Sequence, residues 1–99
     1  MSTSRADRIA AILAGRFAPI VLQVTDDSAR HAGHAGAAPG GQTHYAVLLV
    51  SAAFAGQSRL ARSRAVHDAL AAEFAGGLHA LALTLHTPAE QDKNRSSVE

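Results

Sequence analysis

The 99-residue sequence contains no cysteine, which excludes a disulfide framework and a metal site built from the chain's own thiolates. No stretch approaches the roughly 20 consecutive apolar residues of a transmembrane helix, and the N-terminus lacks the hydrophobic region of a signal peptide. The formal net charge of +1 disfavours a strongly electrostatic nucleic-acid binder without excluding a local basic site. We therefore expect a cytoplasmic, soluble protein that binds no membrane.

The sequence contains six histidines but no cysteine. Any transition-metal site of the chain must therefore use imidazole or carboxylate ligands, or take sulfur from a partner. His79 stands out because residues 78–85 alternate, so that it shares a strand face with Leu81, Leu83 and Leu85. An imidazole at a core-side position is either a structural residue bonded to backbone or a ligand left available at the end of a sheet.

Hydrophobic periodicity predicts a helix over residues 4–16, strands over 20–25 and 44–51, a helix over 58–74 and a strand over 78–86. We expect Ile20, Leu22 and Val24 to face inward from the first strand. The inner face of the second helix is expected to carry Leu60, Ser63, His67, Leu70, Ala71 and Phe74. The pattern indicates an α+β sandwich, in which two helices pack on a three-stranded mixed sheet.

The end of the chain is expected to contribute little to this domain. A capping box over residues 87–90 starts one short turn of helix, and residues 91–99 are polar and lack an apolar stripe. We therefore predict a single domain over residues 1–90, followed by a disordered tail.

The predicted topology brings distant residues to one edge of the sheet. The first two strands form an antiparallel pair, and a right-handed parallel crossover leads to the third. The start of the third strand, at His79, then lies beside the 17-residue loop over 27–43, which contains four glycines, His31 and His34. Unstructured loops longer than about 12–15 residues are typically functional or disordered, so both histidines are either ligands or polar loop residues.

Arg59, Arg62 and Arg64 lie near the start of the second helix, where the helix dipole favours anions. They are either an anion-binding group or a solvated basic face, and only Arg59 and Arg62 clearly share a side. No catalytic constellation is apparent, since the chain has no cysteine nucleophile and no Gly-x-Ser-x-Gly motif. The residues alone therefore predict a small binding domain with histidines at one edge.

Several short segments together form a recognisable set: residues 54–58, Arg62 with Arg64, Val66, Leu70, residues 78–81, Asp27 with Ser28, and Thr87 with Pro88. This combination resembles the BolA family. The resemblance covers about residues 5–90 and implies a fold like the type II KH domain. The family usually has Arg-His-Arg where this chain has Ser63 between the two arginines, so no role of that middle histidine is carried over to this chain.

The resemblance also implies a heterodimer with a monothiol glutaredoxin. In such heterodimers a [2Fe–2S] cluster is held by the glutaredoxin cysteine, glutathione sulfur, the histidine of the third strand and a loop histidine or cysteine. By position, the first histidine is His79, and the loop ligand is His31, with His34 as a substitute. The implied function is a non-enzymatic accessory role in iron–sulfur cluster trafficking or iron regulation.

Two other functions stay open for the same chain. The resemblance also implies a DNA-binding transcriptional regulator that uses a helix-turn-helix-like segment over residues 54–74, with Arg59, Arg62 and Arg64 on the nucleic acid. The other is an adaptor that mediates protein–protein contacts. The free protein could also form a homodimer. Nucleic-acid binding would depend on salt and on the arginines, whereas cluster binding would depend on His79 and a glutaredoxin.

Overall fold

The computed structural model describes residues 4–27 and 43–97, with side chains as far as Lys93. Along the chain the elements are α1 (Arg5–Phe17), β1 (Val21–Asp26), β2 (His44–Val50), the 3-10 turn η2 (Ala52–Phe54), α2 (Arg59–Ala69), α3 (Ala71–Ala75), β3 (Ala80–His86) and α4 (Pro88–Ser97). This arrangement confirms the predicted α+β class and the order of the main elements.

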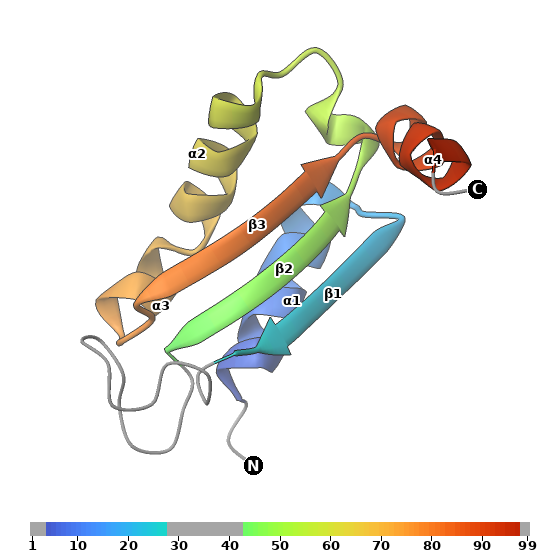
Figure 1. The fold of residues 1–99 in the computed structure, drawn as a ribbon. Coiled ribbons are helices and arrows are strands. Elements are labelled where there is room, and N and C mark those ends of the chain that lie inside the picture. The colour runs from blue at the N-terminus through green and yellow to red at the C-terminus, as the bar shows by residue number, and fades with distance from the viewer. Residues whose placement is uncertain (1–3, 28–42, 98–99) are drawn as a thin grey trace.

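The three strands form one mixed sheet in the order β1-β2-β3 (Figure 1). Strand β2 pairs antiparallel with β1, with Asp26 opposite Tyr45, and parallel with β3, with His44 opposite Ala80. The crossover through α2 and α3 is right-handed, as expected of a parallel connection. The end of β1 and the starts of β2 and β3 therefore meet at one edge, as the sequence predicted.

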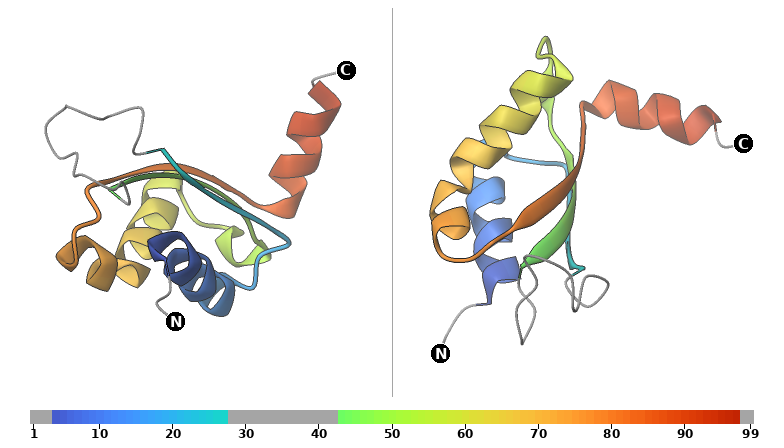
Figure 2. Two further views of the ribbon diagram at one scale, coloured as in Figure 1. Left: turned by 90° about the horizontal axis from the view of Figure 1, so that it is seen from below. Right: turned by 60° about the vertical axis from the view of Figure 1, so that its left-hand side comes forward.

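Helices α1, α2 and α3 lie together on one side of the sheet, whereas α4 projects from its far end toward the other side (Figure 2). The hydrophobic core lies between the sheet and the first three helices. It consists of Ile9, Leu13, Phe17, Tyr45, Val47, Leu49, Phe54, Val66, Leu70 and Leu78. The opposite face of the sheet exposes polar side chains such as Gln23 and Thr84.

The predicted helix starts are confirmed by their caps. Ser4 Oγ accepts a hydrogen bond from Asp7 N at the start of α1, and Ser58 Oγ accepts one from Ala61 N in α2. At α4, Thr87 N donates to Glu90 Oε1 (2.8 Å) and Glu90 N donates to Thr87 Oγ1 (3.2 Å), which completes the capping box.

Two predictions are wrong: the inward orientation of Ile20 and the length of the last helix. Ile20 precedes β1 and is 67% exposed, because the strand starts one residue later and Ile20 extends past the edge of the core. Helix α4 continues to Ser97, well beyond the single turn that the sequence predicted and through most of the expected tail. Within the described residues, no helix is long and apolar enough to span a membrane.

The face that α2 and α3 bury also differs from the prediction. The chain breaks at Leu70 into two helices, and the buried positions are Arg62, Val66, Leu70 and Glu73. Leu60 is 60% exposed, and His67 lies outside and stacks on Phe74. Periodicity missed this face because Arg62 and Glu73 are buried by pairing with charged residues that lie far away in the sequence.

Candidate functional site

His79 lies immediately before β3, at the edge where the chain enters the sheet. Its backbone N–H donates to Thr43 O (2.8 Å), and that carbonyl also accepts from Ala80 N (3.1 Å). The side chain is exposed, whereas Leu81 on the same strand face packs against the core. The expected core-side position is therefore wrong for His79, because the ring extends past the end of the core and remains accessible.

The turn that precedes His79 is held by hydrogen bonds before and at this residue. Gly77 adopts a φ of +121°, a conformation that favours glycine. Leu78 donates from its backbone N–H to Glu73 O (2.9 Å) and buries its side chain to 4% exposure. The backbone of His79 is thus held between a buried anchor and the hydrogen bond to Thr43.

An ion-pair cluster on α1 and α3 supports this turn. Arg5 Nε donates to Glu73 Oε1 (3.1 Å), and Arg8 donates through Nε and Nη2 to both carboxylate oxygens (2.9 Å each). Arg5 Nη2 also donates to Gly76 O (2.8 Å). The hydrogen bonds from Arg8 and then Arg5 lower the pKa of Glu73 against the opposing effect of burial, so the carboxylate stays charged.

His44, the first residue of β2, lies beside His79. The two ring centroids are 5.2 Å apart and the ring planes are inclined at 49°. His44 is 6% exposed, and its Nδ1 lies 2.9 Å from Thr43 Oγ1. We call Thr43, His44 and His79 the histidine edge. Sequence reasoning missed His44, although the predicted meeting of the second and third strands at one edge was the signal that could have found it.

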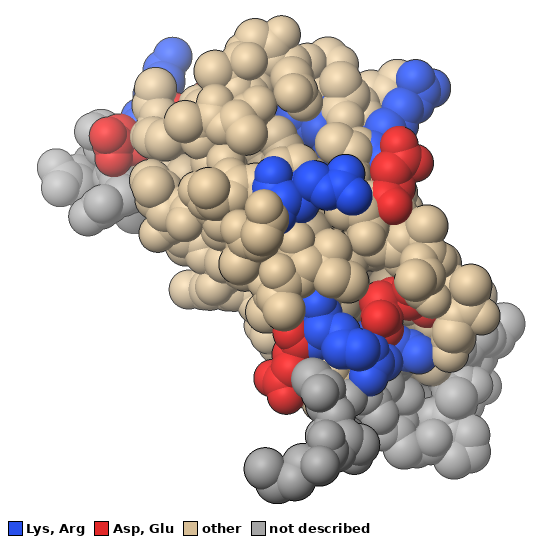
Figure 3. All heavy atoms as spheres, turned by 180° about the vertical axis from the view of Figure 1, so that it is seen from behind, with Lys and Arg blue, Asp and Glu red and all other residues tan. Residues whose placement is uncertain are grey.

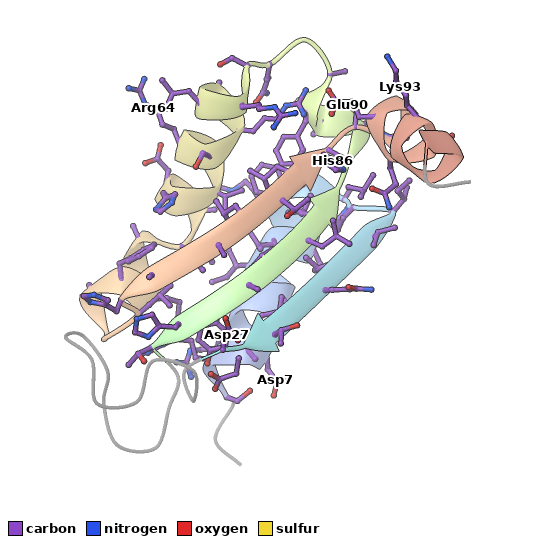
Figure 4. All side chains as sticks on the ribbon, in the orientation of Figure 1. Asp7, Asp27, Arg64, His86, Glu90 and Lys93 are labelled. Carbon is purple, nitrogen blue, oxygen red and sulfur yellow. The ribbon has the colours of Figure 1, made fainter. Side chains whose placement is uncertain are left out.

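His31 and His34 lie outside the described residues, so their predicted role is untested. The segment that carries them leaves the described structure at Asp27, whose N–H donates to His44 O (2.7 Å), and returns at Thr43. Figure 4 shows Asp27 at the same edge of the sheet. Both ends of the segment therefore start from the histidine edge.

The donor set of the histidine edge is nitrogen without sulfur. No group of three or more His, Cys, Asp or Glu side chains that could hold a metal ion occurs within residues 4–27 and 43–97. The exposed imidazole of His79 fits a [2Fe–2S] cluster as one nitrogen ligand, and the thiolates must come from another molecule because the chain has no cysteine.

The opposite end of the sheet carries the basic residues of α2 together with Glu90 from α4, and we call Arg59, Arg62, Ser63, His86 and Glu90 the arginine end. Arg62 donates to Glu90 through two nitrogens (2.6 and 3.1 Å), to Leu85 O (3.1 Å) and to Gln57 O (3.0 Å). The bond from Arg62 is the main reason that the pKa of Glu90 falls to about 2, and Thr87 N adds to it.

The three arginines, for which the sequence left open an anion-binding group or a solvated basic face, thus lie in different surroundings. Arg59 lines a hollow of about 310 Å³ together with Ser63, Thr84 and His86. Arg62 borders the same hollow, but Glu90 engages its guanidinium, and Arg64 points away from the body of the molecule (Figure 4). On the helix side, basic groups lie apart and mostly beside acidic ones (Figure 3), without a continuous basic surface on that face.

This chain is similar in sequence and in structure to several known proteins. A family model described as BolA-like protein matches residues 13–90. SufE-like protein 1, chloroplastic/mitochondrial, of Arabidopsis thaliana is 43% identical over 91 residues, which make up 88% of this chain and 24% of that protein. BolA-like protein 1 of Pongo abelii is 44% identical over 78 residues, or 79% of this chain and 54% of that protein. The chain thus spans about a quarter and about half of these two relatives.

Two further similarities extend over nearly whole chains. The DNA-binding transcriptional regulator BolA of Escherichia coli (strain K12) is 37% identical over 92 residues, or 93% of this chain and 84% of that protein. The solved structure of the BolA domain of SufE1 from Arabidopsis thaliana matches with a TM-score of 0.81 at 41% identity, covering 91% of this chain and 99% of that one.

Proposed function

The chain belongs to the BolA family, and on that premise we propose that it is a non-enzymatic accessory protein that shares a [2Fe–2S] cluster with a monothiol glutaredoxin. The observation that carries this proposal is the exposed imidazole of His79, on a rigid turn at the histidine edge, in a chain without cysteine. In this proposal His79 supplies one nitrogen, a loop histidine supplies a second, and the glutaredoxin cysteine with glutathione supplies sulfur.

The chain's own residues define what such a half-site does. The buried Leu78 and the hydrogen bond to Thr43 fix the backbone of His79, so little ordering is required when a partner docks. Mixed nitrogen and sulfur ligation raises a cluster's reduction potential above that of all-thiolate ligation and makes it sensitive to protonation. These properties suit a role in cluster trafficking or in iron regulation.

Reconstitution with a partner tests the proposal. The protein is mixed with a monothiol glutaredoxin, glutathione, iron and sulfide, and visible absorption and circular dichroism are recorded. We expect a spectrum that differs from that of the glutaredoxin alone, and we expect His79→Ala to remove the difference. His67→Ala is the matched control, because His67 is exposed on α2 outside the histidine edge.

The loop ligand is tested in the same assay. His31→Ala and His34→Ala, made separately, should identify which loop histidine contributes, and equal, negligible effects would remove the loop from the site. An unchanged spectrum for His79→Ala would overturn the proposed ligation as a whole.

DNA-binding regulation is the second candidate, favoured by the name of the Escherichia coli relative and by Arg59 at the hollow of the arginine end. A nucleic-acid interface of this kind should lose affinity steeply with added salt, and each lost phosphate contact reduces the salt slope by about one. Because Glu90 engages Arg62, we expect Arg59→Ala to change that slope more than Arg62→Ala. An affinity independent of salt and of these arginines would exclude this function.

A further inference from the structure

We propose that the outer edge of β3 is a docking site for an extended, acidic segment of a partner protein, which adds to the sheet as a further strand beside Arg59. The proposal needs neither His79 nor the cluster, so it stands apart from the proposed function. It rests on the topology of the sheet, on the hollow beside β3 and on the charge at that hollow.

Strand β3 is an edge strand, because the order of the sheet is β1-β2-β3 (Figure 1). Two hydrogen bonds show which of its main-chain groups face β2: Ala80 N donates to Thr43 O (3.1 Å), and His86 O accepts from Ser51 N (2.9 Å). Main-chain groups alternate in direction along a strand, so every second residue faces the open edge. The residues that face outward are Leu81, Leu83 and Leu85.

The side chain of Arg62 confirms this direction and marks the end of the open edge. Arg62 Nη1 reaches Leu85 O (3.1 Å) from α2, on the side of β3 away from β2. Among the described residues, the N–H of Leu85 and both main-chain groups of Leu83 have no partner on this side. Such a row of unpaired donors and acceptors is the template on which a further strand forms.

The hollow of about 310 Å³ lies where that further strand would run. Its lining includes Leu83 and Leu85, which pack against the core, and also Thr84 and His86, which alternate with them on the opposite face of the sheet. A space that touches successive residues of both faces lies beside the strand, in the plane of the sheet. Neighbouring strands lie about 4.8 Å apart, so a strand added to β3 would enter this hollow.

The charge at the hollow selects the chemistry of the segment. Arg59 lines it from α2, is exposed and has no carboxylate partner among the described residues, whereas Glu90 already engages Arg62. A peptide that pairs with Leu83 through its main chain can therefore place a carboxylate on Arg59. Main-chain bonds of this kind give affinity, and the charged side chain gives preference.

A second copy of this chain is a poorer occupant of the same edge. Strand β3 contains no acidic residue, so pairing of two β3 edges would bring no carboxylate of that strand to Arg59. The outward groups of Leu81 and Leu83 also repeat with the two-residue period of an extended peptide. Both observations favour an acidic peptide from another protein.

A peptide titration of the full-length, ¹⁵N-labelled protein tests the site. The probe is a six-residue peptide of alternating valine and threonine that ends in two glutamates, with both termini capped. We expect the amide signals of Leu83 and Leu85 to shift and to gain protection from hydrogen exchange, while the amide of His79 is unaffected. His79→Ala should bind the peptide as the wild type does, so failure of cluster assembly leaves this inference intact.

Methylation of the peptide backbone tests the strand pairing itself. Two further peptides carry N-methyl groups at every second residue, one in each phase. In an added strand only one phase faces β3, so one peptide should lose at least about tenfold in affinity and the other should bind nearly as before. Equal effects of the two phases overturn the inference.

Charge reversal tests the role of Arg59. Arg59→Glu should weaken binding of the acidic peptide by about fivefold or more and should strengthen binding of a counterpart that ends in two lysines. Arg64→Glu is the matched control, because it makes the same charge change on α2 at a side chain that points away from the body of the molecule (Figure 4). Equal effects of the two variants overturn the inference.

The remaining outcomes identify other occupants, and each overturns the inference. Shifts confined to β1 place the peptide at the other edge of the sheet. Protection of the Leu83 and Leu85 amides that rises with protein concentration alone assigns the edge to a second copy. Single-stranded oligothymidylate that shifts these amides more strongly than the peptide assigns it to nucleic acid. Absence of any shift at about 5 mM peptide shows that the edge does not dock such a segment.

Discussion

The two ends of the sheet use their polar residues in opposite ways. At the arginine end, Arg62 is 6% exposed and its charge is met by Glu90 and by two main-chain carbonyls. At the histidine edge, the backbone of His79 is fixed while its imidazole stays exposed. The comparison shows that the charged guanidinium of Arg62 is used to stabilise the fold, whereas the imidazole of His79 is left accessible to other molecules.

The largest expected effect is on stability at the arginine end. Arg62→Met keeps the aliphatic length but removes four hydrogen bonds from the guanidinium, so we expect a loss of about 2 to 3 kcal/mol in the free energy of unfolding. Urea denaturation measures it. Cluster assembly by the folded protein should be unaffected, and a loss below about 0.5 kcal/mol would show that the charge is not structural.

The turn before His79 should respond next. At Gly77, an alanine would be strained at φ +121° and its Cβ would meet Arg5 Nη2 at 3.4 Å, so Gly77→Ala should destabilise by about 1 to 2 kcal/mol. Gly15→Ala is the control, because Gly15 lies in α1 with no atom within 4 Å of an added Cβ. That helical site should gain about 0.5 to 1 kcal/mol, and equal signs at the two glycines would contradict the account.

The pairing of Glu90 predicts a pH dependence. Its folded pKa of about 2 lies below the ordinary 4.5, so its pairing with Arg62 stabilises the protein above pH 4.5 and is lost as the pH falls toward 2. Glu90→Gln should therefore be less stable than the wild type at neutral pH, with a difference that vanishes on acidification. Urea denaturation of both proteins across this range measures the difference, in which the contribution of Glu73 cancels. A difference that does not change with pH would contradict the pairing.

The smallest effect is expected at Arg64. Its side chain points into solvent, so Arg64→Ala should change the free energy of unfolding by less than about 0.5 kcal/mol. The same variant should leave the visible circular dichroism of the reconstituted complex unchanged. A clear loss of either would mean that the arginine end extends further than Arg62.

Local signals predicted the fold well, and long-range pairing was the part that they missed. Caps at Ser4, Ser58 and Thr87 and the alternation of β3 are encoded within a few residues, which is why the elements and their order were predictable. The buried face of α2 was not, because Arg62 is stabilised by Glu90, 28 residues away. A periodicity count treats such a residue as solvent-facing.

The candidate site was predictable in place but not in detail. Topology alone brought His79 to the edge where the loop ends, as the structure confirms. His44 was overlooked because its neighbour is set by the parallel register with β3, which no local pattern contains. The roles of His31 and His34 stay predictions.

The most direct test of the central claim is whether a nitrogen of this chain binds the shared cluster. The protein, labelled with ¹⁵N only in histidine, is assembled with unlabelled glutaredoxin, glutathione, iron and sulfide, and the cluster is reduced for electron–nuclear double resonance. The account predicts a strongly coupled ¹⁵N signal that His79→Ala abolishes and His67→Ala retains. A cluster that assembles without ¹⁵N coupling, or whose coupling survives His79→Ala, would contradict it.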